Sequence, residues 1–161
     1  MKALIIIDVQ NGLMEKNLFN KDEFIQTINK AISKASKENN PILFIQHNSK
    51  TLENGKHDWQ LFPQLTRPKN EIIIQKKHGD AFKDTGLKQI LEKKNIKEII
   101  ICGLVSHGCV LYTCKTAKEY GFTVKLLKNG HTNWLKNAEE KILEVNKKLE
   151  SIGIEMVEST D

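Results

Sequence analysis

The alternation of short aliphatic runs with amphipathic segments constrains the fold of this chain more than any other feature. Unbroken runs of isoleucine, leucine and valine are typical of strands buried on both faces of a parallel sheet. The segments between them repeat apolar residues at helical spacing. The pattern predicts an α/β fold in three layers, a doubly wound parallel sheet with helices on both faces. We expect strands at residues 3–7, 42–45, 72–74, 98–102, 122–127 and 154–157, and helices at 21–38, 85–94, 108–120 and 137–151.

The chain has 161 residues, a length that suits one domain, and we expect residues 1–161 to form a single one. No apolar run approaches the roughly 20 residues of a membrane span. The opening residues show no signal-peptide pattern. The three cysteines form no Cys-x-x-Cys pair, and their odd number argues against a disulfide framework. We therefore expect a cytoplasmic protein with free thiols and no membrane partner.

The net charge of +5 raises the question of nucleic-acid binding. Arg67 is the only arginine among the 25 basic residues, although arginine is the usual reader of phosphates and base edges. The lysines alternate with acidic residues, as on solvated helix faces. We expect no nucleic-acid partner.

In doubly wound sheets the functional site lies at the carboxyl ends of the strands. Asp8 directly follows the first predicted strand, and Cys109 lies shortly after the fourth, at the start of a predicted helix. Lys76 and Lys77 both follow the third strand, and periodicity does not choose between them. A carboxylate, an ammonium group and a thiol are therefore expected to meet at one edge.

Cys109 is the candidate nucleophile. A thiol at a helix N-terminus faces free N–H groups and the positive end of the dipole, which favour the thiolate. The same N–H groups can hold a developing oxyanion. Cys102 lies within a strand and Cys114 further along the helix, so both are interpreted as packing residues. His107 is the less favoured base, because a residue so close in the turn should point away from Cys109.

Asp8 could cap the turn that follows the first strand or act as a catalytic base. A lysine near the thiol would lower the pKa of the thiol. The residues alone thus predict a cysteine nucleophile assisted by an acid and a lysine. Two other classes with this fold fit less well. A phosphoacceptor receiver needs a second acid near Asp8, and a dinucleotide-binding domain needs a glycine-rich turn where only Gly12 occurs.

Three segments resemble the isochorismatase-like cysteine hydrolases. In residues 3–11 an aliphatic run is followed by Asp8 and Gln10. Residues 76–87 begin with Lys76, which lies six positions before Phe82. Residues 101–110 resemble the nucleophile loop, with Cys109 near its end. Residues 130–132 resemble the stretch after the fifth strand. The resemblance covers nearly the whole chain and favours Lys76 over Lys77.

The resemblance implies strand order 3-2-1-4-5-6, a homodimer or larger homo-oligomer, and a catalytic triad of Asp8, Lys76 and Cys109. It implies a cis peptide between Leu104 and Val105, and an oxyanion hole made by the N–H groups of Val105 and Cys109. The implied reaction cleaves the C–N bond of a small-molecule amide through a thioester. The candidate residues for the substrate pocket are Gln10, His47, Trp59, Phe82 and Leu104.

Family members that cleave nicotinamide usually hold a metal ion with an Asp-x-His pair after the second strand. Here that segment reads Gln46, His47, Asn48 and Ser49, without an aspartate. We therefore expect no metal and no other cofactor. Members that hydrolyse isochorismate typically lack the nucleophilic cysteine. The alternatives are a nicotinamidase with a metal-assisted pocket, and a catalytically silent or redox-sensing member of the family.

Overall fold

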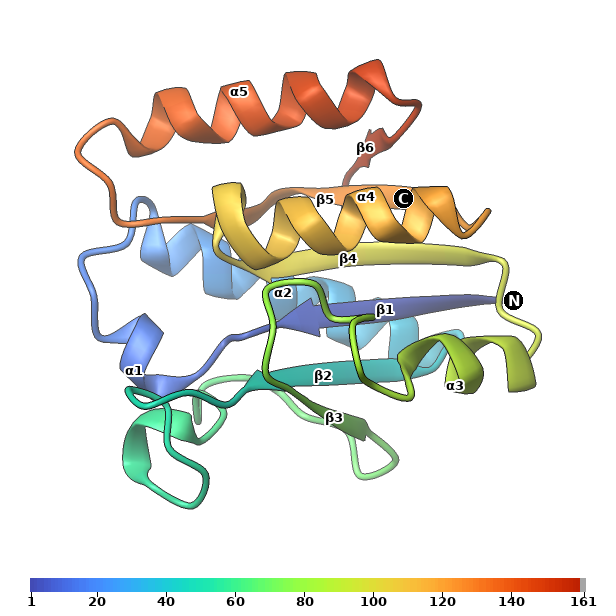
Figure 1. Cartoon of the computed structure of the whole chain (residues 1–161), viewed down its shortest axis with the longest axis horizontal. Coiled ribbons are helices and arrows are strands. Elements are labelled where there is room, and N and C mark those ends of the chain that lie inside the picture. The colour runs from blue at the N-terminus through green and yellow to red at the C-terminus, as the bar shows by residue number, and fades with distance from the viewer. Residues whose placement is uncertain (160–161) are drawn as a thin grey trace.

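Strands and helices alternate from end to end of residues 1–159, the part of the chain that the computed structural model describes (Figure 1). The strands are β1 (Lys2–Ile7), β2 (Ile42–His47), β3 (Ile72–Lys76), β4 (Glu98–Leu104), β5 (Thr123–Thr132) and β6 (Glu155–Val157). The helices are α1 (Asn11–Met14), α2 (Lys21–Lys37), α3 (Leu87–Lys93), α4 (Leu111–Glu119) and α5 (Ala138–Ser151). Two short turns carry functional candidates, η1 (His57–Trp59) and the π turn η2 (Ser106–Val110).

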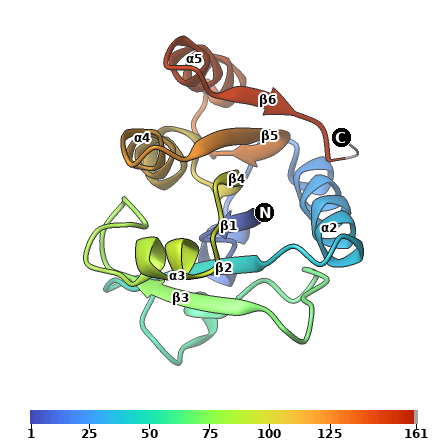
Figure 2. The same cartoon turned by 90° about the vertical axis from the view of Figure 1, so that its right-hand side faces the viewer.

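The six strands form one sheet in the order β3-β2-β1-β4-β5-β6, and every neighbouring pair is parallel. Helix α2 covers one face, and α3, α4 and α5 cover the other (Figure 2). The predicted three-layer fold and its strand order are confirmed. Because all strands run the same way, their carboxyl ends meet at one edge, where α1 also lies (Figure 1).

The core has two parts, one on each face of the sheet. Ile5 and Ile7 of β1 belong to the cluster under α3, α4 and α5, whereas Leu4 and Ile6 belong to the cluster under α2. This is the alternation expected of a central strand buried on both sides. The apolar stripe that the sequence predicts for the first long helix faces the sheet from α2. Its residues are Phe24, Ile25, Ile28, Ala31, Ile32 and Ala35.

The structure departs from the sequence expectation at two places near the carboxyl edge. The sequence predicts that the fifth strand ends at residue 127, whereas β5 extends to Thr132. Its pairing with β4 is interrupted after Leu126 and resumes at His131 and Thr132, beside the end of β4. The helix expected from residue 108 begins only at Leu111, because the backbone of Gly108 is not helical. Cys109 therefore lies in the π turn before α4.

Gly103 is the glycine that the sheet requires most clearly. Its φ is +124°, and a Cβ built there would lie 2.1 Å from the backbone oxygen of Ile7 in the adjacent strand. The backbone of Gly103 fixes the position of the Cβ, and the oxygen belongs to the backbone of β1, so neither atom can rotate away. The close approach of β4 to β1 at this point thus depends on the missing side chain.

Gly103→Ala is expected to lower the free energy of unfolding by about 3 kcal/mol or more, because the clash adds to the strain of a positive φ. Gly121→Ala is the matched control, since Gly121 has a φ of +90° and no atom of residues 1–159 lies within 4 Å of a Cβ built there. The control should lose only about 1 kcal/mol. Chemical denaturation of both variants measures the difference. Equal losses would show that close packing at Gly103 contributes nothing.

Candidate active site

Three side chains meet at the carboxyl edge, from the end of β1, the end of β3 and the π turn η2. The Nζ atom of Lys76 lies 3.0 Å from Oδ2 of Asp8 and 3.3 Å from Sγ of Cys109. Asp8 and Lys76 are only 2% and 1% exposed, whereas Cys109 is half-buried. The ammonium group therefore lies between a carboxylate and a thiol, and the thiol is the group of the three that a substrate can reach.

The alternation of strand β3 explains why Lys76, and not Lys77, enters this group. Ile74 and Lys76 are buried, while Gln75 and Lys77 are exposed. Side chains two positions apart on a strand share a face, so Lys76 follows Ile74 into the interior. The sequence pattern left open whether Lys76 or Lys77 enters the site. Because β3 extends through Lys76, its alternation directs Lys76 inward.

Asp8 occupies a sharp turn directly after β1. Its φ of 56° is left-handed, a conformation that aspartate tolerates better than most residues, and its N–H donates to the carbonyl of Ile45 at 3.0 Å. One carboxylate oxygen binds Lys76, whereas Oδ1 is buried with no hydrogen-bond partner among the described residues. Burial raises the pKa of Asp8, and the charge of Lys76 partly offsets this. The unpartnered oxygen is suited to accept a proton.

The resting state of Cys109 differs from the expectation drawn from the sequence. Burial, followed by the negative charge of Asp8, raises the pKa of the Cys109 thiol to about 12. Lys76 lowers it, but by less. Cys109 lies just before α4, and the positive end of that helix does not outweigh the burial of the thiol. The resting thiol is therefore protonated and needs a base, and the Asp8 carboxylate lies within 4.8 Å of Sγ.

Alkylation of Cys109 by iodoacetamide is expected to accelerate beyond about pH 9, above the range of an ordinary thiol with a pKa of about 8.5. Asp8→Asn should move the profile to lower pH, because it removes a negative charge that disfavours the thiolate. Mass spectrometry of the Cys109 peptide measures the rates, with the fully buried Cys102 as an internal unreactive thiol. A wild-type profile that levels off near pH 8.5 would contradict this electrostatic account.

The loop between β4 and Cys109 has the shape that the family resemblance implies. The peptide bond between Leu104 and Val105 is cis. The N–H groups of Gly108 and Val110 both donate to the carbonyl of Val105, at 3.1 and 3.3 Å. The N–H of Val105 itself makes no hydrogen bond within residues 1–159, so it can serve a bound group.

Four of the five pocket candidates divide into two sets, and the fifth, Trp59, lies in η1 with its indole N–H donating to Gln75 at 3.2 Å. Gln10 fixes the neighbouring loops, because its Nε2 donates to the carbonyls of His47 and Trp59 at 3.0 and 2.8 Å. His47 contacts Lys76 directly. Phe82 instead packs in the core against the rings of Tyr120 and Phe122, and Leu104 is fully buried under α2. The structure therefore brings His47 into contact with Lys76, whereas Phe82 and Leu104 are buried core residues.

A buried polar network that the sequence did not reveal lies behind the loop that carries Cys109. The imidazole of His131 lies 2.7 Å from both Ser106 Oγ and Asn146 Oδ1. Because the amide oxygen of Asn146 only accepts, Nε2 of His131 carries the proton. Burial lowers the pKa of His131, so the ring is neutral and Ser106 donates to Nδ1. Asn133 donates to Ser106 at 3.3 Å. The network joins β5 and α5 to the loop that carries Cys109.

The side chains around Lys76 do not fit a metal ion. Asp8, His47 and Cys109 offer ligand atoms within 4.8 Å of one another, but the ammonium of Lys76 lies within hydrogen-bonding distance of all three. The positive charge of Lys76 is therefore already in contact with all three side chains that could bind a metal cation. His57 belongs to a separate, exposed group with Glu15 and Asp58.

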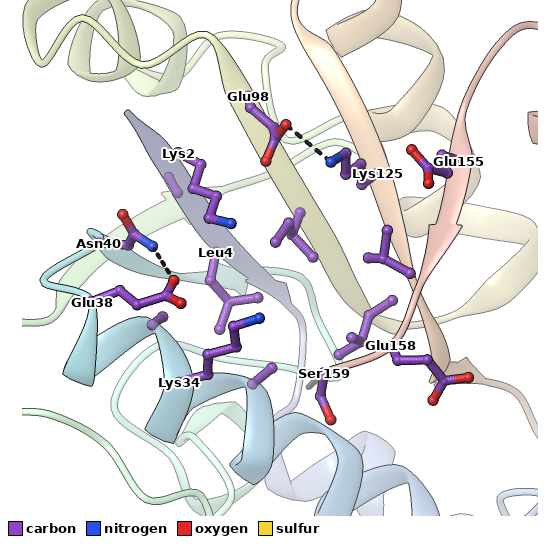
Figure 3. A pocket seen from close by; sticks show the side chains of 16 residues that line it. Lys2, Leu4, Lys34, Glu38, Asn40, Glu98, Lys125, Glu155, Glu158 and Ser159 are labelled. Carbon is purple, nitrogen blue, oxygen red and sulfur yellow. Dashed lines mark hydrogen bonds and ion pairs between the residues drawn. The ribbon is translucent and has the colours of Figure 1, made fainter. Parts of the chain in front are cut away.

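A cavity of about 160 Å³ lies apart from these residues, on the α2 side of the sheet (Figure 3). Lys2, Glu98 and Glu155 begin their strands on its rim, so it lies toward the amino ends of the strands. Glu98 of β4 forms an ion pair with Lys125 of the neighbouring strand β5 on the rim, at 3.1 Å. None of its lining residues is a cysteine, histidine or aspartate. Asp8, Lys76 and Cys109 lie at the opposite edge of the sheet.

Comparison with known proteins gives a consistent result. The isochorismatase domain model matches residues 2–148. The chain is 30% identical over 128 residues to the secreted isochorismatase effector Isc1 of Verticillium dahliae, which is 76% of this chain and 67% of that protein. It is 27% identical over 143 residues to nicotinamidase 3 of Arabidopsis thaliana, which is 76% of this chain and 68% of that protein. It is 25% identical over 142 residues to streptothricin hydrolase of Streptomyces noursei, which is 83% of this chain and 55% of that protein.

A crystal structure of an isochorismatase family protein superposes with a TM-score of 0.92 at 26% identity, covering 97% of each chain. No helix within residues 1–159 is long and apolar enough to cross a membrane. Both the sequence match and the fold extend over nearly the full described chain. The chain belongs to the isochorismatase family and is a hydrolase of that family.

Proposed function

We propose that this protein is a cysteine hydrolase that cleaves the C–N bond of a small amide, with Asp8, Lys76 and Cys109 as its catalytic residues. The observation that carries the proposal is the position of the Lys76 ammonium, 3.0 Å from the Asp8 carboxylate and 3.3 Å from the Cys109 thiol. A nucleophile needs a base within reach, and Asp8 supplies one. The similarity to a nicotinamidase supports an amide as the substrate class.

The reaction begins when Asp8 takes the thiol proton as Sγ of Cys109 attacks the carbonyl carbon. The carbonyl electron pair moves to oxygen, and the N–H groups of Val105 and Cys109 stabilise that oxyanion. When the oxyanion collapses, the C–N bond breaks, and Asp8 returns the proton to the departing amine. A thioester remains on Cys109.

Water then attacks the thioester, and Asp8 takes a proton from it. The C–S bond breaks, the acid leaves, and the proton returns to the Cys109 sulfur. Throughout the cycle Lys76 stays beside whichever group carries the negative charge, first the carboxylate and then the thiolate. This explains why a buried ammonium is placed between two groups that exchange one proton.

Ammonia release from a panel of small amides, nicotinamide included, tests the proposal when wild type and Cys109→Ala are compared. We expect release by the wild type and none by the variant. Turnover that survives in Cys109→Ala would exclude the thiol as nucleophile. A reactive wild-type thiol with no turnover on any amide would instead favour a redox-sensing member of the family.

Three broader expectations accompany this proposal. We propose that residues 1–161 act as a single domain, supported by one sheet that contains every strand of residues 1–159. We propose a cytoplasmic location, supported by three cysteines that are all unpaired. We also propose assembly into a homodimer or larger oligomer, supported by large exposed apolar side chains such as Tyr112 and Leu143.

A further inference from the structure

His47 makes the shortest contact of the catalytic lysine. Its Nδ1 lies 2.7 Å from Nζ of Lys76. Nζ of Lys76 also contacts the Asp8 carboxylate at 3.0 Å, the carbonyl of His78 at 3.0 Å and the sulfur of Cys109 at 3.3 Å. An ammonium group has three N–H donors. Four acceptors therefore compete for three protons, and Cys109 makes the longest of the four contacts.

The contact fixes the protonation of the imidazole ring. To accept from Lys76, Nδ1 must carry no proton, so the neutral ring carries its proton on Nε2. The groups around the ring favour this state. Burial and the charge of Lys76 lower the pKa of His47, His78 adds to the effect, and Asp8 partly opposes it.

The other side of the ring is open. Nε2 of His47 makes no hydrogen bond within residues 1–159, and it is not among their buried unpartnered atoms. The backbone of His47 is clamped at both ends by Gln10, which accepts from its N–H at 3.0 Å and donates to its carbonyl at 3.0 Å. The ring is thus held still with an unpaired N–H donor beside the reactive thiol.

We propose that His47 is a fourth functional member of the site, which positions the Lys76 ammonium through Nδ1 and donates through Nε2–H to an acceptor atom of the bound substrate. The donor role rests on the amide hydrolysis proposed above. Asp8 and Lys76 are buried, so the half-buried His47 and Cys109 form the side of the site from which a substrate approaches. The donor favours an amide with a hydrogen-bond acceptor near the scissile carbonyl.

Asparagine and alanine at position 47 separate the two roles. An asparagine oxygen can replace Nδ1 as an acceptor for Lys76 but cannot reach outward as Nε2 does, whereas alanine removes both groups. His57→Ala is the control, because His57 is an exposed histidine paired with Glu15.

The first measurement is the rate of Cys109 alkylation by iodoacetamide at pH 8, which requires no turnover. His47→Ala frees one N–H of Lys76 for the sulfur, so the thiolate is stabilised and alkylation should be at least about threefold faster. His47→Asn and His57→Ala should match the wild type. An unchanged or slower rate in His47→Ala would overturn the positioning role, and so would an asparagine variant that behaves like alanine.

The second measurement compares KM and kcat on the amide that the wild type hydrolyses best. His47→Asn should raise KM by about fivefold, the effect of one lost hydrogen bond, with kcat nearly unchanged. His47→Ala should raise KM and also lower kcat, because it removes the acceptor for Lys76 as well as the donor. An unchanged KM in His47→Asn would overturn the donor role. A wild type that hydrolyses no amide would disprove the proposed function and the donor role, while the alkylation rates would still decide the positioning role.

Discussion

Cys109→Ser is expected to lower kcat by about 10⁴-fold or more, because a serine hydroxyl is a far weaker acid than a thiol. In this site the cost is especially large. The Asp8 carboxylate lies within 4.8 Å of the sulfur, and burial and Asp8 together already raise the pKa of the thiol to about 12. Asp8 can take the thiol proton only as the sulfur attacks, and a hydroxyl demands still more of it. Ammonia release under single-turnover conditions measures the loss.

The matched control is Cys114→Ala, which removes a thiol that is fully buried in the core. It should keep kcat and lose about 1 kcal/mol of unfolding free energy through the small cavity it creates. Circular dichroism should show that the serine variant is folded. A serine enzyme with nearly wild-type turnover would contradict thiol catalysis.

Asp8→Asn is expected to have the largest effect on stability. It leaves the ammonium of Lys76 buried at 1% exposure without the charge that pairs with it. Breaking a buried pair by removing one partner costs about 3–5 kcal/mol. The variant should also lose activity, since the proton acceptor is gone.

The double variant Asp8→Asn/Lys76→Met separates stability from catalysis. Removing both charges leaves no unpaired ion, so we expect it to regain about 2 kcal/mol or more over Asp8→Asn alone. It should remain inactive. Urea denaturation and ammonia release measure the two properties on the same samples. A double variant less stable than Asp8→Asn would show that the ion pair does not dominate the energetics of this site.

The sequence predicted the fold and the meeting of the three catalytic candidates because both follow from chain direction. Parallel strands bring Asp8, the end of β3 and the loop of Cys109 to one edge whatever the loops do. The choice of Lys76 over Lys77 required the family resemblance, although the alternation within a strand of known length gives the same answer.

The protonation state and the side-chain contacts of the site depend on distances in the folded chain, which the periodicity of the sequence does not predict. The protonated state of Cys109 follows from how deeply Asp8 and the thiol are buried, which only packing determines. The contact between Ser106 and His131 exists because β5 leaves the ladder and then pairs again at His131. Phe82 was a pocket candidate, yet its ring fills the core beside Phe122. Sequence placed His47 near the pocket but gave no sign of its contact with Lys76.

The central claim is that Cys109 carries a covalent acyl group during turnover. Intact-mass spectrometry of samples quenched early in the reaction with the best amide tests it most directly. We expect a mass increase equal to the acyl part of the substrate, located on Cys109 and lost at the rate of turnover. Steady release of ammonia with no adduct on Cys109 at any time, even after the thioester step is slowed at low temperature, would contradict the account.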